Sequence, residues 1–182
     1  MKSYLGGISV DKLEELNARG KAMDMYILIG PPAAGKSTWI EKVFQGECTV
    51  ISTDNIIEYI ASIQGSTYDE VFSQYIKPAE QMMWCEFDDA VKSKYYPIVI
   101  DRTNMSIKSR AKFFERLKNF HKGHTYKIHA VVYPKPDDVE HERRLNSRPG
   151  KTIPPQVLRS MISSFQMPTL GEGFSSITII ED

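Results

Sequence analysis

The residues of this chain best able to do chemistry lie between Gly30 and Thr38, in the order Gly-Pro-Pro-Ala-Ala-Gly-Lys-Ser-Thr. This order fits the pattern G-x-x-x-x-G-K-[ST], in which a curled backbone turns several N–H groups inward. Gly30 and Gly35 are expected to take backbone angles that a side chain would forbid. A ring of amides at the positive end of a following helix binds phosphate oxygens. The segment therefore predicts a nucleoside triphosphate site.

Two side chains of this loop have expected roles toward ATP and Mg²⁺. Lys36 is expected to reach the β- and γ-phosphates and to assist their transfer, and the Ser37 hydroxyl to ligate Mg²⁺. The residues expected to surround the phosphates are Gly30, Ala33, Ala34, Gly35, Lys36, Ser37 and Thr38. A chance match is the competing interpretation, but the apolar run 25–29 directly before the loop reads as the strand that such a site requires.

Two aspartates follow apolar runs further along the chain. Asp54 comes after the run 48–52, and we expect it to be the general base that accepts the proton of an incoming hydroxyl. Asp101 ends the run 98–100 and has the form of an acid that holds Mg²⁺, directly or through water. Aspartate is also a good N-cap, so helix capping is the competing interpretation of both residues. Thr103 and Asn104, just beyond Asp101, either donate to a phosphate of the acceptor or only stabilise the turn.

A basic segment from Glu142 to Lys151 contains four cations within nine residues, and Pro149-Gly150 interrupts its helical pattern. This composition predicts a mobile lid whose arginines stabilise the charge of a phosphoryl group in transfer. We expect Arg144 and Arg148 to be that pair. The alternative is a basic helix end that complements its own dipole.

Strands and helices that alternate along the chain must position these residues. Apolar runs predict strands over 25–29, 48–52, 97–101, 126–133 and 176–180. Helical spacing predicts helices over 10–19, 38–45, from 54 onward, 68–94, 106–121, 137–146 and 157–165, with a break favoured near Pro78. The expected fold is α/β, a three-layer sandwich of the P-loop NTPase type with a parallel sheet of about five strands and helices on both faces.

This fold predicts where the site lies. Ligands bind at the carboxyl ends of parallel strands, so Gly30, Asp54 and Asp101 are expected in one place. We expect a single kinase domain over residues 1–182, in which 1–23 are an N-terminal extension.

Composition limits the classes of function. The 182 residues are 41% hydrophobic and 25% charged, which is ordinary for a globular protein. No apolar run has the length of a membrane span and the first residues lack a leader, so we expect no membrane partner and a cytoplasmic location, in host cytoplasm if the protein is viral. Cys48 and Cys85 read as reduced thiols. No pattern in the sequence sets the oligomeric state.

Charges and aromatic residues are unevenly distributed. Residues 54–89 contain eight acidic side chains and one lysine, whereas 102–127 contain eight basic side chains and one glutamate. These are either solvated helix faces or, for the second stretch, a basic rim that attracts a polyanion, although the balanced total of 23 basic and 23 acidic residues argues against a nucleic-acid footprint over the whole surface. Aromatic residues at helical spacing favour a core face over a stacking platform; they are Tyr68, Phe72, Tyr75, Trp84 and Phe87.

From about residue 25 to residue 180 the chain resembles the polynucleotide kinase family of P-loop phosphotransferases. The segments that carry the likeness are 30–39, 51–54, 100–104, 144–148, 153–158 and 165–174. The last two are not general features of P-loop proteins and carry much of the specificity. The resemblance implies ATP-dependent phosphorylation of a nucleic acid 5′-hydroxyl end, with Asp54 as the base, Arg148 as the lid arginine and Thr103 near a phosphate of the acceptor.

Two positions depart from the pattern of that family. Ile57 stands where an arginine often grips the acceptor phosphate, and Thr53 stands where a basic residue often precedes the base. Arg102 could take over that grip. The departures favour a kinase for another hydroxyl, on hydroxymethylpyrimidine bases of phage DNA or on a small molecule. A third hypothesis is a nucleotide-binding interaction module without catalysis, against which Asp54 and Arg148 together argue.

Overall fold

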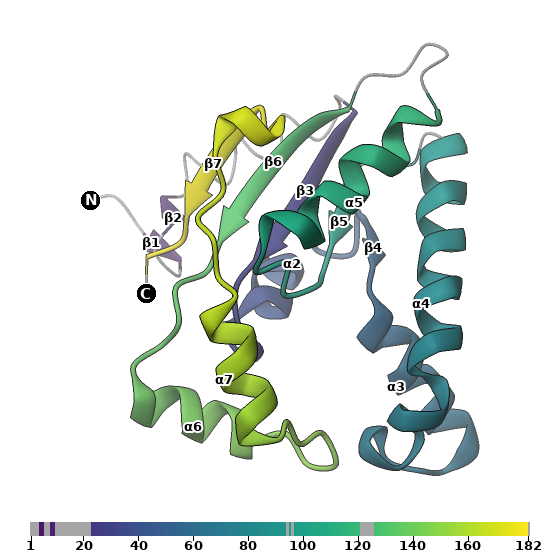
Figure 1. The fold of residues 1–182 in the computed structure, drawn as a ribbon, viewed down its shortest axis with the longest axis vertical. Helices are drawn as coiled ribbons and strands as arrows, with labels where there is room; N and C mark the ends of the chain where they lie inside the picture. The colour runs from purple at the N-terminus through teal and green to yellow at the C-terminus, as the bar shows by residue number, and fades with distance from the viewer. Residues whose placement is uncertain are drawn as a thin grey trace.

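A parallel sheet of five strands crosses the molecule (Figure 1). The computed structural model describes residues 23–93, 95, 97–120 and 126–181, and the backbone of two short strands near the N-terminus. The strands of the sheet are β3 (Asp24–Ile29), β4 (Thr49–Ile51), β5 (Ile98–Ile100), β6 (Lys127–Val132) and β7 (Ser176–Ile179), in the spatial order β4-β5-β3-β6-β7. All neighbouring pairs are parallel. The five strands predicted from the sequence are thus confirmed.

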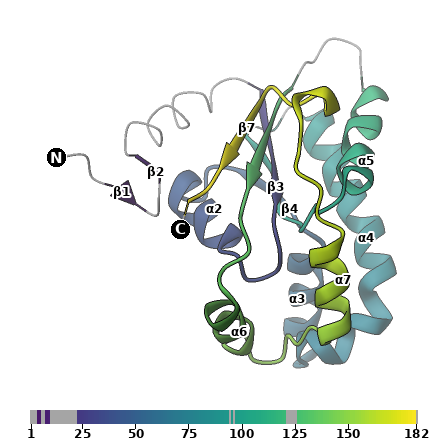
Figure 2. The same cartoon turned by 60° about the vertical axis from the view of Figure 1, so that its left-hand side comes forward.

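Helices cover both faces of this sheet, as Figure 2 shows. Helix α2 (Lys36–Phe44) packs on one face through Trp39 and Val43, against Tyr26 and Leu28 of β3. Helices α3 (Thr53–Gln64), α4 (Tyr68–Lys92) and α5 (Ile107–Lys118) cover the other face. Because side chains of a strand alternate between its two faces, β3 contributes to both cores and is buried throughout. This is the three-layer α/β arrangement of P-loop kinase-like proteins, as predicted.

Helix α4 is continuous, which corrects the break favoured near Pro78. The proline ring lies on the exposed side of the helix, where water can satisfy the carbonyl that loses its partner. The buried side carries Val71, Ala79, Met83 and Phe87 into the core, and this packing holds the two halves in line. Its first turn is closed by a capping box between Thr67 and Glu70.

The aromatic residues of α4 serve two purposes. Phe87 is fully buried and Trp84 packs beside it, both against Phe113 of α5, as expected for a core face. Tyr68 and Phe72 lie at the other end of the helix with ring centroids 5.4 Å apart. The Tyr68 ring packs against the edge of the core, and its hydroxyl donates to Asp54 at 3.0 Å.

Two further helices lie beyond the carboxyl ends of the strands, at the bottom of Figure 1. They are α6 (Asp138–Asn146) and α7 (Pro155–Ser163), and a short 3-10 helix η1 (Leu170–Glu172) precedes β7. At the N-terminus, β1 (Tyr4–Leu5) pairs antiparallel with β2 (Ile8–Ser9), and the helix predicted over 10–19 lies outside the described residues. None of the helices in the described ranges is long and apolar enough to span a bilayer.

Candidate functional site

The loop between β3 and α2 has the curled backbone predicted from its pattern. Gly35 takes a left-handed conformation with φ 93°, and Ala33 has φ 59°. No atom lies within 4 Å of a Cβ built at Gly35, so its requirement for glycine is conformational and not steric. Helix α2 begins immediately after it, with Ser37 and Thr38 exposed and no acidic residue in the first turn. The free amides of that turn can therefore receive an anion.

Gly30 serves a different purpose from the one predicted. Its φ is not positive, so the expectation of a forbidden backbone angle is wrong for this residue. The restriction is close packing, because a Cβ at Gly30 would lie 2.7 Å from both Cβ and the carbonyl oxygen of Tyr133. The Gly30 amide also donates to the Thr103 carbonyl at 2.9 Å, which ties the loop to the segment after β5.

Lys36 is folded back onto the loop. Its Nζ donates to the carbonyls of Gly30 at 3.0 Å and Pro31 at 2.6 Å, and only 7% of the residue is exposed. Burial lowers the pKa of Lys36 to about 8, partly opposed by the negative charges of Asp101 and Asp54. The two aspartates only partly compensate the burial of this ammonium, and the phosphates of a nucleotide would supply further negative charge.

Ser37 and Asp101 come together although they are 64 residues apart in sequence. The Ser37 hydroxyl donates to Oδ2 of Asp101 at 3.2 Å. Burial raises the pKa of Asp101, whereas the charge of Lys36 opposes that rise. A desolvated carboxylate beside a hydroxyl is an oxygen donor set that suits Mg²⁺, which keeps several waters and takes its remaining ligands from phosphates. The two residues thus fit the metal role predicted for them.

Asp54 is free of the capping role that was its alternative. The N-cap of α3 is Ser52, whose hydroxyl accepts from the Asn55 amide at 3.3 Å. Asp54 instead accepts from the Tyr68 hydroxyl at 3.0 Å through Oδ1 and pairs with Lys151 Nζ at 2.8 Å through Oδ2. Asp101 is not an N-cap either, since α5 begins after Ser106.

Opposing influences act on the ionisation of Asp54. Burial is the largest single one and would raise the pKa of Asp54, but the charge and hydrogen bond of Lys151 and the hydrogen bond of Tyr68 outweigh it. The result is a pKa below the ordinary value, so Asp54 is a carboxylate at neutral pH. Burial, together with the charge and the hydrogen bond of Asp54, raises the pKa of Tyr68, which therefore stays a hydrogen-bond donor.

The two arginines predicted for the lid lie in different surroundings. Arg148 lies near enough to Lys36 and Asp54 to lower the pKa of both, and its guanidinium makes no hydrogen bond within the described part of the chain. Arg144 is held by Glu140, one turn back on α6, with Nε at 2.6 Å from Oε1. Arg148 therefore acts electrostatically on two residues of the site, whereas the Arg144 guanidinium is engaged by a residue of its own helix.

The three residues predicted to contact the acceptor after β5 also lie in different surroundings. Asn104 is 3% exposed, and its amide donates to the carbonyl of Leu28 at 2.8 Å, so it stabilises the turn, which was the second of its two predicted roles. Arg102 is part-exposed and lies 3.5 Å from Glu80 of α4. The Thr103 side chain is part-exposed, and its backbone carbonyl holds Gly30. Ile57 is fully buried, so its position on α3 cannot grip an acceptor.

Sequence reasoning missed two residues of the site. Lys151 was counted in the basic segment but given no role, although it contacts Asp54 directly. His141 of α6 is 3% exposed, and its Nε2 lies 2.8 Å from the Pro32 carbonyl, to which it must donate. This bond fastens α6 to the phosphate loop. A lone histidine has no pattern that would have revealed it.

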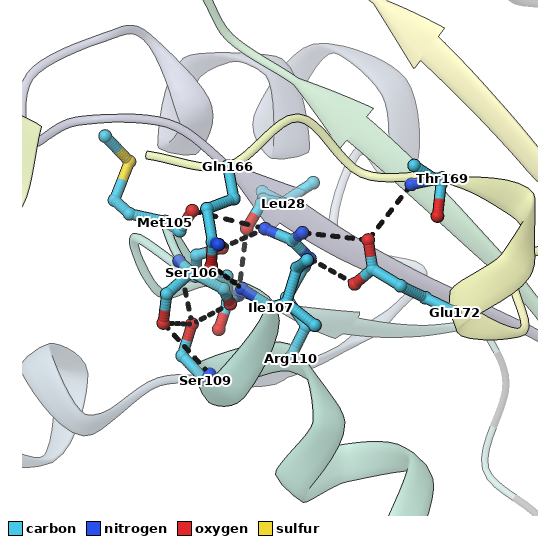
Figure 3. A network of polar contacts seen from close by, with 10 residues as sticks. Leu28, Met105, Ser106, Ile107, Ser109, Arg110, Gln166, Thr169 and Glu172 are labelled. Carbon is cyan, nitrogen blue, oxygen red and sulfur yellow. Dashed lines mark hydrogen bonds and ion pairs between the residues drawn. The ribbon is translucent and has the colours of Figure 1, made fainter. Parts of the chain in front are cut away.

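A buried ion pair holds the segment after β5 in place (Figure 3). Arg110 is completely buried and forms two bonds with Glu172, at 2.8 and 2.9 Å. Its third nitrogen donates to the carbonyls of Asn104 at 3.0 Å and Met105 at 3.3 Å. The C-terminal segment thereby supports the loop that carries Asp101, which gives a structural reason for its distinctive sequence.

Replacing Arg110 by methionine is expected to lower the free energy of unfolding by about 3–5 kcal/mol, because the change leaves the mostly buried Glu172 carboxylate without its cation and, among the described residues, with only the Thr169 amide as a donor. Urea denaturation followed by circular dichroism measures the loss. The double variant Arg110→Met/Glu172→Gln should recover part of it, and Arg143→Met, which breaks an exposed pair, should cost about 1 kcal/mol or less. A loss no larger than that of Arg143→Met would contradict the structural role.

Comparison with known proteins agrees with this architecture. The sequence model of a family described as AAA domain matches residues 25–168. The crystal structure of a proposed kinase from Chloroflexus aurantiacus J-10-fl is similar with a TM-score of 0.62 and 22% identity, over 86% of each chain. A structure from the PezAT chromosomal toxin–antitoxin system of Streptococcus pneumoniae has a TM-score of 0.53 and 19% identity, over 97% of this chain and 80% of that one. Identities this low show a shared fold.

Proposed function

The chain belongs to the AAA domain family, and from this membership and the geometry of its site we propose that it is an ATP-dependent kinase that phosphorylates an alcohol, in the first instance the 5′-hydroxyl end of a nucleic acid. The observation that carries the proposal is the position of Asp54. It caps no helix, it is ionised, and it lies close enough to the phosphate-loop lysine to raise the pKa of Lys36. A module that only binds nucleotide has no need of such a carboxylate.

The residues support an in-line transfer. The loop amides and Lys36 hold the triphosphate, and Asp54 accepts the proton of the alcohol as its oxygen attacks the γ-phosphorus. The new P–O bond forms while the bond to the bridging oxygen of ADP breaks, and Arg148 neutralises charge on the group in transfer. The products are a phosphomonoester, ADP and one proton. Ser37 and Asp101 would hold Mg²⁺, whose chemistry is to neutralise phosphate charge.

A second candidate is a kinase for a different hydroxyl, on a modified pyrimidine base or a small molecule. The observation in its favour is that neither of the two described positions considered for gripping an acceptor phosphate offers an unpaired cation. Ile57 is in the core, and Arg102 is paired with Glu80. The acidic side chains of α3 and α4 around Asp54 also disfavour a polyanion; they include Glu58 and Asp69.

One assay separates these functions. The protein is incubated with γ-labelled ATP and Mg²⁺ in the presence of 5′-hydroxyl DNA, 5′-hydroxyl RNA or duplex DNA with hydroxymethyluracil. Label at strand ends supports the first proposal, whereas label within strands supports the second. Bound ATP without transfer to any of the three contradicts the nucleic-acid proposals, and a panel of small alcohols then decides between a small-molecule kinase and a binding module.

The two lid arginines provide a matched pair of variants. Arg148→Ala is expected to lower kcat about 100-fold or more, because a cation that stabilises transition-state charge is lost. Arg144→Ala removes the same kind of side chain four residues away, where Glu140 already holds it, and is expected to change kcat less than about fivefold. Steady-state rates with the accepted substrate measure both. Equal losses would show that the lid acts through its total charge and not through Arg148.

A further inference from the structure

The Lys151 side chain lies between two carboxylates of α3. Its Nζ is 2.8 Å from Oδ2 of Asp54 and 2.6 Å from Oε1 of Glu58, and it sits 4.3 Å from the ring centroid of Tyr68. Only 11% of the side chain is exposed. Asp54 and Glu58 are one helical turn apart and lie on the same side of α3. The ammonium therefore neutralises two acids that would otherwise repel each other.

The backbone around Lys151 is docked on the first turn of α4. The Asp69 amide donates to the Gly150 carbonyl at 2.9 Å, and both oxygens of the Asp69 carboxylate accept from the Thr152 amide at 2.9 Å. Gly150 has φ 71°, and a Cβ there would lie 2.9 Å from Cβ of Thr67. These three backbone contacts place Lys151, so its approach to Asp54 does not depend on a flexible side chain alone.

We propose that Lys151 is a positioning residue, which keeps the Asp54 carboxylate ionised and oriented for the acceptor when the segment 148–152 is docked on α4. The inference rests on the proposed function of Asp54 as a base. Each carboxylate oxygen can accept a second hydrogen bond, so Lys151 and Tyr68 hold Asp54 and still leave it able to accept from an alcohol.

The charges around Asp54 support this role. Tyr68 of α4 donates to Asp54, and Lys151 of the segment after α6 pairs with it. Arg148 of the same segment and Lys36 of the phosphate loop add positive charge nearby. Asp101 at the end of β5 and Glu58 of α3 are the neighbouring acids. Burial raises the pKa of Asp54, and Lys151 is the foremost influence that lowers it. Without that ammonium, burial and the neighbouring acids would dominate.

Docking of this segment also couples the two substrates. Arg148, the cation expected to meet the phosphates of ATP, and Lys151, the cation that meets the base, are three residues apart. The hydrogen bonds between this segment and Asp69 therefore bring both cations to the site. A base that is held only in the docked state would favour transfer when the nucleotide is already enclosed.

The test is a direct titration of Asp54 by carbon-13 NMR of carboxyl-labelled protein, with the resonance assigned by its loss in Asp54→Asn. Lys151→Met is expected to raise the pKa of Asp54 by about 1 unit or more, and Lys151→Arg to keep it low. The acid limb of the pH–rate profile should move by the same amount in the same direction. Glu58→Gln removes a neighbouring acid and is expected to leave the pKa unchanged or lower.

Asp69→Ala distinguishes docking from simple electrostatics. Through space alone, loss of an anion would lower the pKa of Asp54, but release of the docked segment takes Lys151 away and should raise it. An unchanged pKa in Lys151→Met, or a lowered one in Asp69→Ala, would overturn the inference. Thermal melts establish whether each variant is folded. If Lys151→Met is unfolded, Lys151→Gln is used in its place. If the variants show these shifts but the wild-type protein transfers phosphate to no acceptor, the proposed function is refuted and the role of Lys151 toward Asp54 remains.

Discussion

Asp54→Asn is expected to abolish most phosphoryl transfer, with kcat reduced about 100- to 10,000-fold, while ATP binds with nearly unchanged affinity. The carboxamide has almost the shape of the carboxylate but cannot take a proton from the acceptor, and general-base catalysis contributes a factor of this size. Asp54 belongs to α3, whereas the atoms that hold the triphosphate belong to the phosphate loop and α2, so the two effects are separable.

The measurement is single-turnover transfer of labelled phosphate alongside ATP binding by calorimetry. Asp54→Ala should give a similar loss. Tyr59→Ala is the matched control, because Tyr59 is 66% exposed on the same helix, and it should keep normal transfer. If Asp54→Asn weakens ATP binding as much as it slows transfer, Asp54 is a structural residue of the nucleotide site and not the base.

Lys36→Ala is expected to impair both binding and transfer. Loss of a charged hydrogen bond to phosphate should weaken ATP affinity about tenfold to hundredfold, and loss of its stabilising charge should lower kcat about 100-fold or more. Lys42→Ala removes an exposed lysine of the same helix and is expected to change neither. Undiminished turnover in Lys36→Ala would contradict the assignment of the phosphate loop.

The lowered pKa of Lys36 predicts how ATP affinity depends on pH. The free protein holds Lys36 with a pKa of about 8, and a bound triphosphate favours its charged form, so binding takes up a proton above that pH. The affinity for ATP should therefore be highest well below pH 8 and should fall as the pH rises, by about tenfold between pH 7 and pH 9. Lys36→Arg does not titrate in this range and should show no such fall, which calorimetry at several pH values can test.

Much of the fold could be predicted from sequence because its causes are local. The apolar runs before Gly30 and Asp101 are short and bounded by turns, and such runs form buried parallel strands. The break favoured at Pro78 was wrong because a proline on the solvent side of a helix costs only one hydrogen bond, which water replaces, while the buried side of α4 keeps its packing.

The candidate site was predictable where a side chain acts through its neighbours in sequence. Gly35, Lys36 and Ser37 form a contiguous pattern, and the hydrogen bond between Ser37 and Asp101 follows once strands β3 and β5 lie side by side. The patterns around Asp54 and Asn104 left capping or turn roles open, and only contacts decided between them. Ser52 is the N-cap of α3, and the side-chain amide of Asn104 donates to the Leu28 carbonyl.

The sequence by itself thus determined that a loop for phosphates follows a buried strand, and which acids stand at strand ends, because backbone conformation and strand formation depend on nearby residues. Tertiary structure alone decided which distant cation meets which acid. Arg144 and Arg148 both lie in the same basic segment of the sequence, but Arg144 pairs with Glu140, whereas the charge of Arg148 acts on Lys36. Lys151 reaches Asp54 across 97 residues because Asp69 docks its backbone, and charge pairs of this kind depend on distances that sequence spacing does not contain.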